Sequence, residues 1–248
     1  MGAGTDTRYF RLREDDRHNN LVYHEIDFYD MTVNKIRIIS SRTSLAPLDD
    51  ENLEGIAPNS HGNFYSTTYN IHGLDLKKGV PSVLPNLKKD CATLLISECC
   101  LCYLQPEEAS NVIDHFVRTI ATLGIIIYEP TNPSTSFGQM MKSNLAARGL
   151  YMPTLEVWGS LAQQKDRLAQ AGFANDQQAA SIQWLWDKWV HPTEKERLDE
   201  IETLDEVEEW DLLARHYVIT WGYRDPMKTG AFNDWGRLCP GPGSRPGY

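Results

Sequence analysis

Short apolar runs alternate along this chain with stretches whose hydrophobic residues recur at a helical period. Residues 92–97 and 124–128 are almost continuously apolar, which is typical of strands covered on both faces in a parallel sheet. Residues 63–70 instead alternate between aromatic and polar side chains, as a strand with one exposed face does. Together with 21–27 and 216–221, these runs are the strands that the pattern predicts.

Helical periodicity and end signals mark the segments between these runs. The clearest helix begins at Pro106, has two acidic residues in its first turn and carries an apolar stripe as far as Ile120. Residues 193–196, Thr-Glu-Lys-Glu, predict a capping box at the start of another helix. The expected helices are 9–13, 31–39, 106–120, 132–149, 161–171, 175–190, 193–201 and 205–214.

The order of these segments predicts the fold class and the domain organisation. Strand, helix and strand recur, which favours a doubly wound α/β sheet with helices on both faces. We expect a single domain over residues 1–235, with a long loop over 40–62. The Gly- and Pro-rich residues 236–248 are expected to form a flexible tail.

Charge and composition narrow the classes of function. The net charge is −10 and the pI is about 5.2, so no basic surface argues for nucleic acid or for an anionic membrane. No apolar run approaches the length of about 18 residues that spans a bilayer, and no secretory signal follows Met1. The chain has 5 cysteines, an odd number, which favours a reducing compartment. We therefore expect a cytoplasmic monomer.

The cysteines and histidines give no metal signal. Cys99 and Cys102 have the spacing of half a zinc motif, but a second pair is missing, so we interpret them as small apolar core residues. The 7 histidines show no ligand spacing either. The sequence therefore predicts no metal site.

The first residues carry the candidate chemistry. Gly2 and Gly4, separated by one residue, permit a turn whose backbone N–H groups approach a ligand closely, although such a pair is by itself a weak signal. Asp6 and Thr7 offer side-chain oxygens that can fasten this turn or cap the next helix. Asp27 ends an apolar run 25 positions after Gly2, near the spacing of about 20 residues at which an acid takes ribose hydroxyls.

These motifs resemble one known family. Gly2-Ala-Gly-Thr-Asp-Thr-Arg8, Glu25-Ile-Asp-Phe28 and Leu95-Ile-Ser-Glu-Cys99 are similar to segments of the leucine carboxyl methyltransferases. The likeness extends from Gly2 to about Trp221. It implies a Rossmann-like class I methyltransferase fold and S-adenosylmethionine as cofactor. The implied substrate is the C-terminal leucine carboxylate of the protein phosphatase 2A catalytic subunit, whose tail would be the partner.

The resemblance assigns roles to particular residues. Gly2 and Gly4 would let the loop approach the methionine end of the cofactor, and Asp27 would accept hydrogen bonds from its ribose. Asp75 and Leu76 match the pair beside adenine, the first for the exocyclic amine and the second for packing on the ring.

The remaining candidate site residues lie in or just after the motif of residues 95–99, or at the end of the glycine loop and just beyond it. Glu98 matches a position near the cofactor's amino group or sulfonium, and Tyr103 would offer its aromatic face to the sulfonium. Arg8 or Arg11 could bind a carboxylate. The ordinary alternatives are a strand-end cap for Asp27, a loop acid for Asp75, a core tyrosine for Tyr103 and surface ion pairs for the arginines.

The chain departs from the family pattern at its start. Family members carry a buried strand before the glycine loop and an N-terminal helical region that supplies an arginine to the cofactor carboxylate. This sequence begins at the loop, so we expect a fragment, a misplaced start codon or a degenerate copy. The first strand of the sheet would then be missing or truncated, and the edges of its neighbours would be unpaired.

Three other functions stay open. A sister branch of the family modifies a hypermodified guanosine in transfer RNA, usually with a large additional repeat domain. A non-catalytic phosphatase-binding module is the second alternative, and retained cofactor binding would argue against it. An NAD dehydrogenase is the third, but Thr7 stands where its fingerprint has a third glycine.

Overall fold

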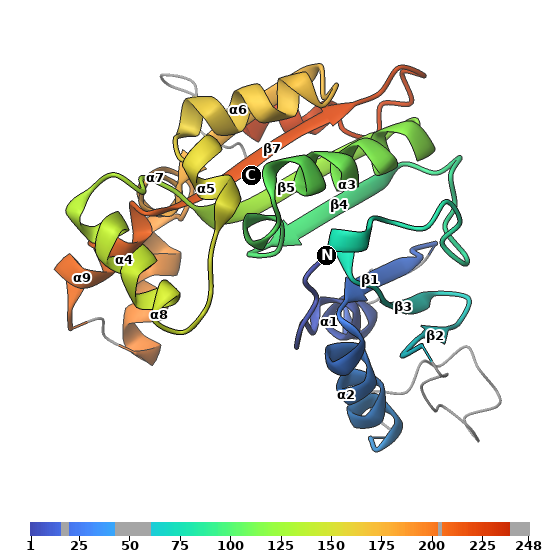
Figure 1. Cartoon of the computed structure of the whole chain (residues 1–248). Coiled ribbons are helices and arrows are strands. Elements are labelled where there is room, and N and C mark those ends of the chain that lie inside the picture. The colour runs from blue at the N-terminus through green and yellow to red at the C-terminus, as the bar shows by residue number, and fades with distance from the viewer. Residues whose placement is uncertain (16–19, 43–60, 203–204, 239–248) are drawn as a thin grey trace. The chain divides into compact units, whose positions relative to one another are not determined.

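The computed structural model describes residues 1–15, 20–42, 61–202 and 205–238. Two compact units divide the chain, residues 1–89 and residues 90–248, and each is described by itself. Each contains a mixed sheet with flanking helices (Figure 1), so the predicted α/β class is confirmed. No described helix combines the length and the apolar character that a bilayer-spanning segment requires.

The first unit is built on a small three-stranded sheet. Its strands are β1 (Tyr23–Asp27), β2 (Phe64–Tyr65) and β3 (Tyr69–Gly73), in the order β1-β3-β2. β1 and β3 run parallel, and β2 is antiparallel to β3. The helices are α1 (Arg8–Glu14), α2 (Tyr29–Ser40) and the 3₁₀ helix η2 (Leu76–Lys78).

Aromatic and aliphatic side chains join α1 and α2 to this sheet. Tyr9 of α1 stacks on Tyr69 of β3, with ring centroids 4.2 Å apart. Ile36 and Ile39 of α2 lie in the same buried cluster, at the i and i+3 spacing of one helix face. This packing fixes both helices against one face of the sheet.

The second unit is built on a four-stranded sheet. Its strands are β4 (Thr93–Glu98), β5 (Leu123–Pro130), β6 (Asn175–Ser181) and β7 (Tyr217–Arg224), in the order β4-β5-β7-β6. β4 and β5 are parallel, while β7 is antiparallel to both β5 and β6. The helices are α3 (Pro106–Thr119), α4 (Ser136–Ala146), α5 (Pro153–Val157), α6 (Leu161–Gln170), α7 (Ile182–Lys188), α8 (Pro192–Ile201) and α9 (Val207–Ala214), with 3₁₀ helices η3 (Leu101–Tyr103) and η4 (Asn233–Leu238).

Helix α3 shows how local sequence sets an element of this unit. Pro106 occupies its first turn, and the Glu108 carboxylate accepts a hydrogen bond from the N–H of Gln105 at 2.8 Å. Ala109, Val112, Ile113 and Phe116 form its buried face. The predicted start and apolar stripe of this helix are confirmed.

Three predicted elements differ in the structure. Residues 63–70 form two strands, because Ser66 hydrogen-bonds with the backbone N–H and C=O of Tyr69 and closes a tight turn between them. Residues 175–181, predicted as part of a helix over 175–190, form strand β6. Pairing with β7 supplies the backbone hydrogen bonds, and the polar sequence of this segment carries no strand pattern. His191, rather than Thr193, caps α8, and Pro192 is its first residue.

Two further predictions concern segment limits. Helix α4 begins only at Ser136, where the Thr135 hydroxyl accepts a hydrogen bond from the N–H of Gly138. Most of the expected loop over 40–62 and most of the expected tail over 236–248 lie outside the described residues. Within that tail, Gly236–Leu238 belong to η4. The prediction of one domain over residues 1–235 stays a prediction.

Candidate functional site

The glycine loop lies against the end of β1. Gly2 and Gly4 have φ angles of 67° and 45°, in the left-handed region that favours glycine. The N–H of Gly2 donates to the Ile26 carbonyl at 2.9 Å, and the N–H of Gly4 donates to Oδ2 of Asp27 at 2.7 Å. A Cβ on Gly4 would have no neighbour within 4 Å, so its backbone borders open space.

Asp27 joins this loop to the end of the strand. Its Oδ1 accepts a second hydrogen bond from the N–H of Phe28 at 2.7 Å. The side chain thus fills the strand-end role that was its ordinary alternative. A carboxylate has about four acceptor positions, so two remain for a ligand.

A pocket of about 470 Å³ opens at the carboxyl ends of the two parallel strands β1 and β3. Phe28 and Tyr29, which follow β1, are both half-exposed. The lining residues are Phe28, Tyr29, Gly73, Leu74, Asp75, Lys78, Gly79, Val80 and Pro81. This edge of parallel strands is where α/β sheets bind ligands.

Asp75 and Leu76 lie beside this pocket in different ways. Asp75 lines it and also caps η2, accepting a hydrogen bond from the N–H of Lys77 at 3.1 Å. Leu76 is buried at 6% exposure and does not line the pocket. The two residues predicted as a pair therefore divide into a pocket acid and a core side chain.

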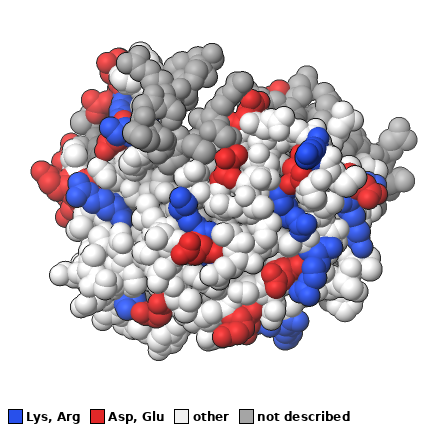
Figure 2. Space-filling view, turned by 90° about the horizontal axis from the view of Figure 1, so that it is seen from above, with Lys and Arg blue, Asp and Glu red and all other residues white. Residues whose placement is uncertain are grey.

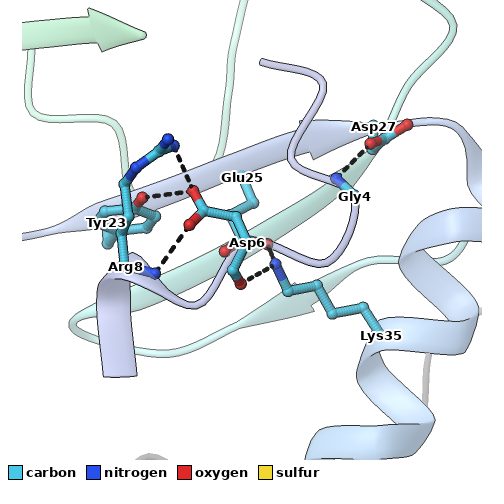
Figure 3. A network of polar contacts seen from close by, with 7 residues as sticks. All are labelled: Gly4, Asp6, Arg8, Tyr23, Glu25, Asp27 and Lys35. Carbon is cyan, nitrogen blue, oxygen red and sulfur yellow. Dashed lines mark hydrogen bonds and ion pairs between the residues drawn. The ribbon is translucent and has the colours of Figure 1, made fainter. Parts of the chain in front are cut away.

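Asp6 organises the other side of the glycine loop (Figure 3). Its Oδ1 accepts from the N–H of Arg8 at 2.8 Å, and its Oδ2 accepts from the Arg8 guanidinium at 2.9 Å and the Tyr23 hydroxyl at 3.2 Å. Thr7 stands at the N-cap position of α1 without a side-chain cap bond, so Asp6 ties the turn instead. Burial and the neighbouring Asp6 raise the pKa of Tyr23, which keeps its hydroxyl a hydrogen-bond donor.

Arg8, which the sequence suggested as a group that binds a substrate carboxylate, therefore already pairs with an acid of the protein. Its guanidinium bonds Asp6 and its side chain is 38% exposed. It matches the alternative of an ion pair with a nearby acid. Binding a substrate carboxylate as well would require Arg8 to share or exchange that partner.

Glu98 and Tyr103 belong to the second unit. Glu98 is exposed at the last position of β4, and Cys99 follows with a left-handed φ of 43°. Tyr103 ends η3 with 37% of its surface exposed, and desolvation raises its pKa to about 12. The side chain is therefore neutral at physiological pH, and its exposed ring can contact a ligand.

An aromatic pair accompanies these residues at the same sheet. Tyr128 of β5 stacks on Tyr217 of β7, with ring centroids 5.2 Å apart. Tyr128 is the register partner of Glu98, so the pair adjoins the end of β4. Sequence periodicity assigned both tyrosines to strands and gave no reason to expect this stack.

The cysteines of this unit pack as apolar residues. Cys102 is 1% exposed and lies in a cluster with Met152 and Leu155, against which Cys99 also packs. Desolvation raises the pKa of Cys99 to about 11 and that of Cys102 further, so both stay thiols at neutral pH. The interpretation as a core side chain is confirmed for Cys102, while Cys99 is only partly buried.

Two histidines that are far apart in the sequence lie in contact on neighbouring strands. His24 of β1 and His72 of β3 stack, and Nδ1 of His24 lies 3.0 Å from Nε2 of His72. Desolvation lowers the pKa of each ring to about 4. At neutral pH the two rings are thus an uncharged, hydrogen-bonded pair.

Charged side chains are interspersed on the face seen in Figure 2. Small groups of acidic and basic residues lie among uncharged ones, and neither sign gathers over a broad part of the described surface in this view. The overall charge of −10 reflects 34 acidic against 24 basic residues in the whole sequence.

The structure thus brings predicted residues together in the first unit, whereas Glu98 and Tyr103 lie on β4 and η3 of the second unit. Gly4 is hydrogen-bonded to Asp27, Gly2 is hydrogen-bonded to the adjacent Ile26, and Asp75 follows the neighbouring parallel strand. Sequence reasoning missed the pocket residues Phe28 and Tyr29 and Lys35 of α2, whose side chain is 10% exposed. The exposed aromatic pair directly after Asp27 was the available signal for the pocket.

Comparison with known proteins gives this arrangement a family. A model described as leucine carboxyl methyltransferase matches residues 1–117. Leucine carboxyl methyltransferase 1 of Aspergillus fumigatus is 40% identical, over 95% of this chain and 67% of that protein. The protein of the same name from Schizosaccharomyces pombe is 38% identical, over 89% of this chain and 70% of its own length.

Two solved structures are similar to this chain at low identity. Mycolic acid cyclopropane synthase CmaA1, complexed with SAH and CTAB, has a TM-score of 0.49 at 9% identity, covering 90% of this chain and 75% of that one. An O-methyltransferase family protein from Burkholderia thailandensis has a TM-score of 0.47 at 14% identity, covering 90% and 49%. Membership follows from the sequence relatives: this chain belongs to the leucine carboxyl methyltransferase family.

Proposed function

We propose that this protein transfers the methyl group of S-adenosylmethionine to the α-carboxylate of a C-terminal leucine, and that the leucine ends the protein phosphatase 2A catalytic subunit. The family membership supports the reaction class. One observation carries the cofactor part. Gly4 and Asp27 hydrogen-bond to each other at the end of β1, and the pocket opens at the same sheet edge.

The residues of the first unit fit an adenosyl group. The free acceptor positions of Asp27 suit the two ribose hydroxyls. Asp75 faces the pocket with a carboxylate for an exocyclic amine, and the half-exposed rings of Phe28 and Tyr29 offer apolar surface to a flat base. The open space beside Gly4 leaves room for the remainder of the cofactor.

The chemistry asks little of the protein beyond positioning. An α-carboxylate has a pKa of about 3.3–3.7, so it is ionised at neutral pH and needs no general base. When bound, S-adenosylmethionine supplies the electrophilic methyl group. The residues therefore align one carboxylate oxygen and exclude water from it. In this proposal Glu98 holds the amino group of the cofactor, and the ring of Tyr103 lies toward its positive charge.

Cofactor binding is the first test. S-adenosylhomocysteine titrated by calorimetry should bind the protein, and Asp27→Ala should weaken binding by about 10- to 150-fold because a charged acceptor is lost (~1.5–3 kcal/mol). Asp90→Ala, which removes an exposed acid elsewhere, should leave the affinity unchanged. Equal affinity for Asp27→Ala in a folded protein would remove Asp27 from the site.

Substrate choice is the second test. A peptide with the phosphatase tail and a free C-terminal leucine should gain a base-labile methyl ester, whereas the same peptide with a C-terminal amide should not react. Methylation of the amide peptide would contradict carboxylate transfer. No methylation of the free peptide or of the intact phosphatase subunit by a protein that binds the cofactor would contradict the proposed reaction, whereas loss of both cofactor binding and methylation would favour the non-catalytic binding module.

A further inference from the structure

A buried ammonium group reaches the glycine loop from α2. Nζ of Lys35 donates a hydrogen bond to the backbone carbonyl of Asp6 at 2.8 Å and forms an ion pair with the carboxylate of Glu25 (Figure 3). The side chains of Lys35 and Glu25 are 10% and 2% exposed. Burying two charges is costly, so contacts of this kind must be compensated by precise partners.

The two partners of Lys35 belong to different parts of the site. Glu25 lies on β1, two residues before Asp27, so both side chains point to the same face of the strand. Asp6 belongs to the loop itself, between Gly4 and α1. Lys35 therefore bridges the strand that carries the ribose acid and the loop that carries the glycines.

This bridge completes the attachment of the loop. The beginning of the loop is held by the Ile26 carbonyl, and its middle by the bond between Gly4 and Asp27. Its last part is held through the Asp6 carbonyl by Lys35. Without that third attachment, the segment between Gly4 and Arg8 keeps the side-chain bonds of Asp6 but loses its connection to α2.

The electrostatics show why a cation is needed there. Desolvation raises the pKa of Glu25, and the neighbouring Lys35 is the largest influence in the opposite direction. An uncharged residue at position 35 would leave a buried carboxylate without its counter-ion. It would also leave the Asp6 carbonyl without this donor.

We propose that Lys35 is a positioning residue for the cofactor: by holding the Asp6 carbonyl against β1, it keeps Gly4 in the conformation that receives the ligand. This inference rests on the proposed function of the glycine loop. It adds a role for a residue of α2 that does not line the pocket.

The test separates positioning from stability. Lys35→Met should weaken S-adenosylhomocysteine binding by at least about tenfold, and in turnover assays KM for S-adenosylmethionine should rise more than kcat falls. Lys35→Arg, which keeps the charge and the donors, should recover most of the affinity. Ile36→Ala, which removes a fully buried side chain from the same helix, should lower the unfolding midpoint while affinity stays within about twofold.

A double variant covers the case in which Lys35→Met does not fold. Glu25→Leu combined with Lys35→Met removes the unpaired carboxylate and should restore folding, yet binding should stay weak because the Asp6 carbonyl still lacks its donor. Normal affinity in this double variant or in folded Lys35→Met would overturn the positioning role. If the unmodified protein itself binds no S-adenosylhomocysteine, the proposed function fails instead.

Discussion

Among the described residues, an ion pair shielded from solvent occurs in each unit, and the two pairs have different surroundings. In the first unit Lys35 pairs with Glu25 and also holds the backbone of the glycine loop. In the second unit Arg167 of α6 pairs with Glu129 of β5 at 3.0 Å, with side chains only 3% and 2% exposed. The two pairs therefore differ in the contact that each cation makes besides its carboxylate.

The surroundings of Arg167 belong to the core. Its guanidinium lies over the ring of Trp158, 4.1 Å from the centroid, and Gln164 donates to the Trp158 carbonyl at 3.0 Å. Nε and Nη2 of Arg167 are buried without a hydrogen-bond partner among the described residues. This pair thus joins α6 to the sheet, and loss of one member would leave the other charge buried without a partner. The pair of the first unit instead joins α2 to a loop that borders open space.

The largest expected effect is on the stability of the second unit. Arg167→Met should lower the free energy of unfolding by about 3–5 kcal/mol, because Glu129 would remain buried without its counter-ion. Denaturant unfolding measures this loss, and Glu129→Leu in the same chain should recover most of it. S-adenosylhomocysteine affinity of the folded variant should stay unchanged, in contrast to Lys35→Met. A loss below about 1 kcal/mol would mean that the pair contributes little net stability.

The next effect separates catalysis from stability within the second unit. Glu98→Ala should reduce turnover by about tenfold or more, as expected for the loss of a charge-assisted hydrogen bond to the cofactor (~1.5–3 kcal/mol). Because Glu98 is exposed, the unfolding midpoint should hardly move. Glu202→Ala, at another exposed acid of this unit, serves as the control. Normal methylation rates for Glu98→Ala would count against its assignment.

The histidine pair predicts an acid sensitivity of the first unit. His24 and His72 have folded pKa values near 4, below the unfolded value of about 6.5, because burial disfavours their charged forms. The unfolded chain therefore binds more protons, and stability falls as the pH drops from about 6.5 towards 4. His72 is buried and His24 is partly exposed, and we expect a loss on the order of 1–2 kcal/mol per ring.

Unfolding curves at several pH values measure this loss. The double variant His24→Phe/His72→Leu should show a flatter dependence over the same range. His115→Phe, on α3 of the second unit, should keep the steep pH dependence of the unmodified protein. If the double variant keeps the pH dependence of the unmodified protein, the loss of stability in acid comes from other groups.

The smallest effect concerns a turn after β7. Desolvation alone would raise the pKa of Asp225, but hydrogen bonds from the N–H groups of Thr229 and Gly230 and from the hydroxyls of Thr229 and Thr122 outweigh it and lower the pKa. The stabilisation is present above the unfolded pKa and is lost as the pH falls through the folded one. Asp225→Asn should thus lower the midpoint slightly at pH 7, and less at pH 3. An equal shift at both values would exclude the carboxylate charge as the cause.

The sequence by itself determined the elements whose signals are local. The apolar runs of β4 and β5 and the Pro106 start and apolar stripe of α3 could be predicted, because burial and capping act within a few neighbouring residues. The glycine loop and Asp27 were also accessible, since their spacing along the chain reflects the backbone geometry that joins them.

Only the tertiary structure decided the contacts between distant segments. The polar residues of β6 became a strand because β7 pairs with them. His24 meets His72, which is 48 positions away, and Lys35 reaches Asp6, which is 29 positions away. Such contacts depend on which strands become neighbours and on which helix face is buried, and a long-range choice of this kind leaves no periodic mark in the sequence.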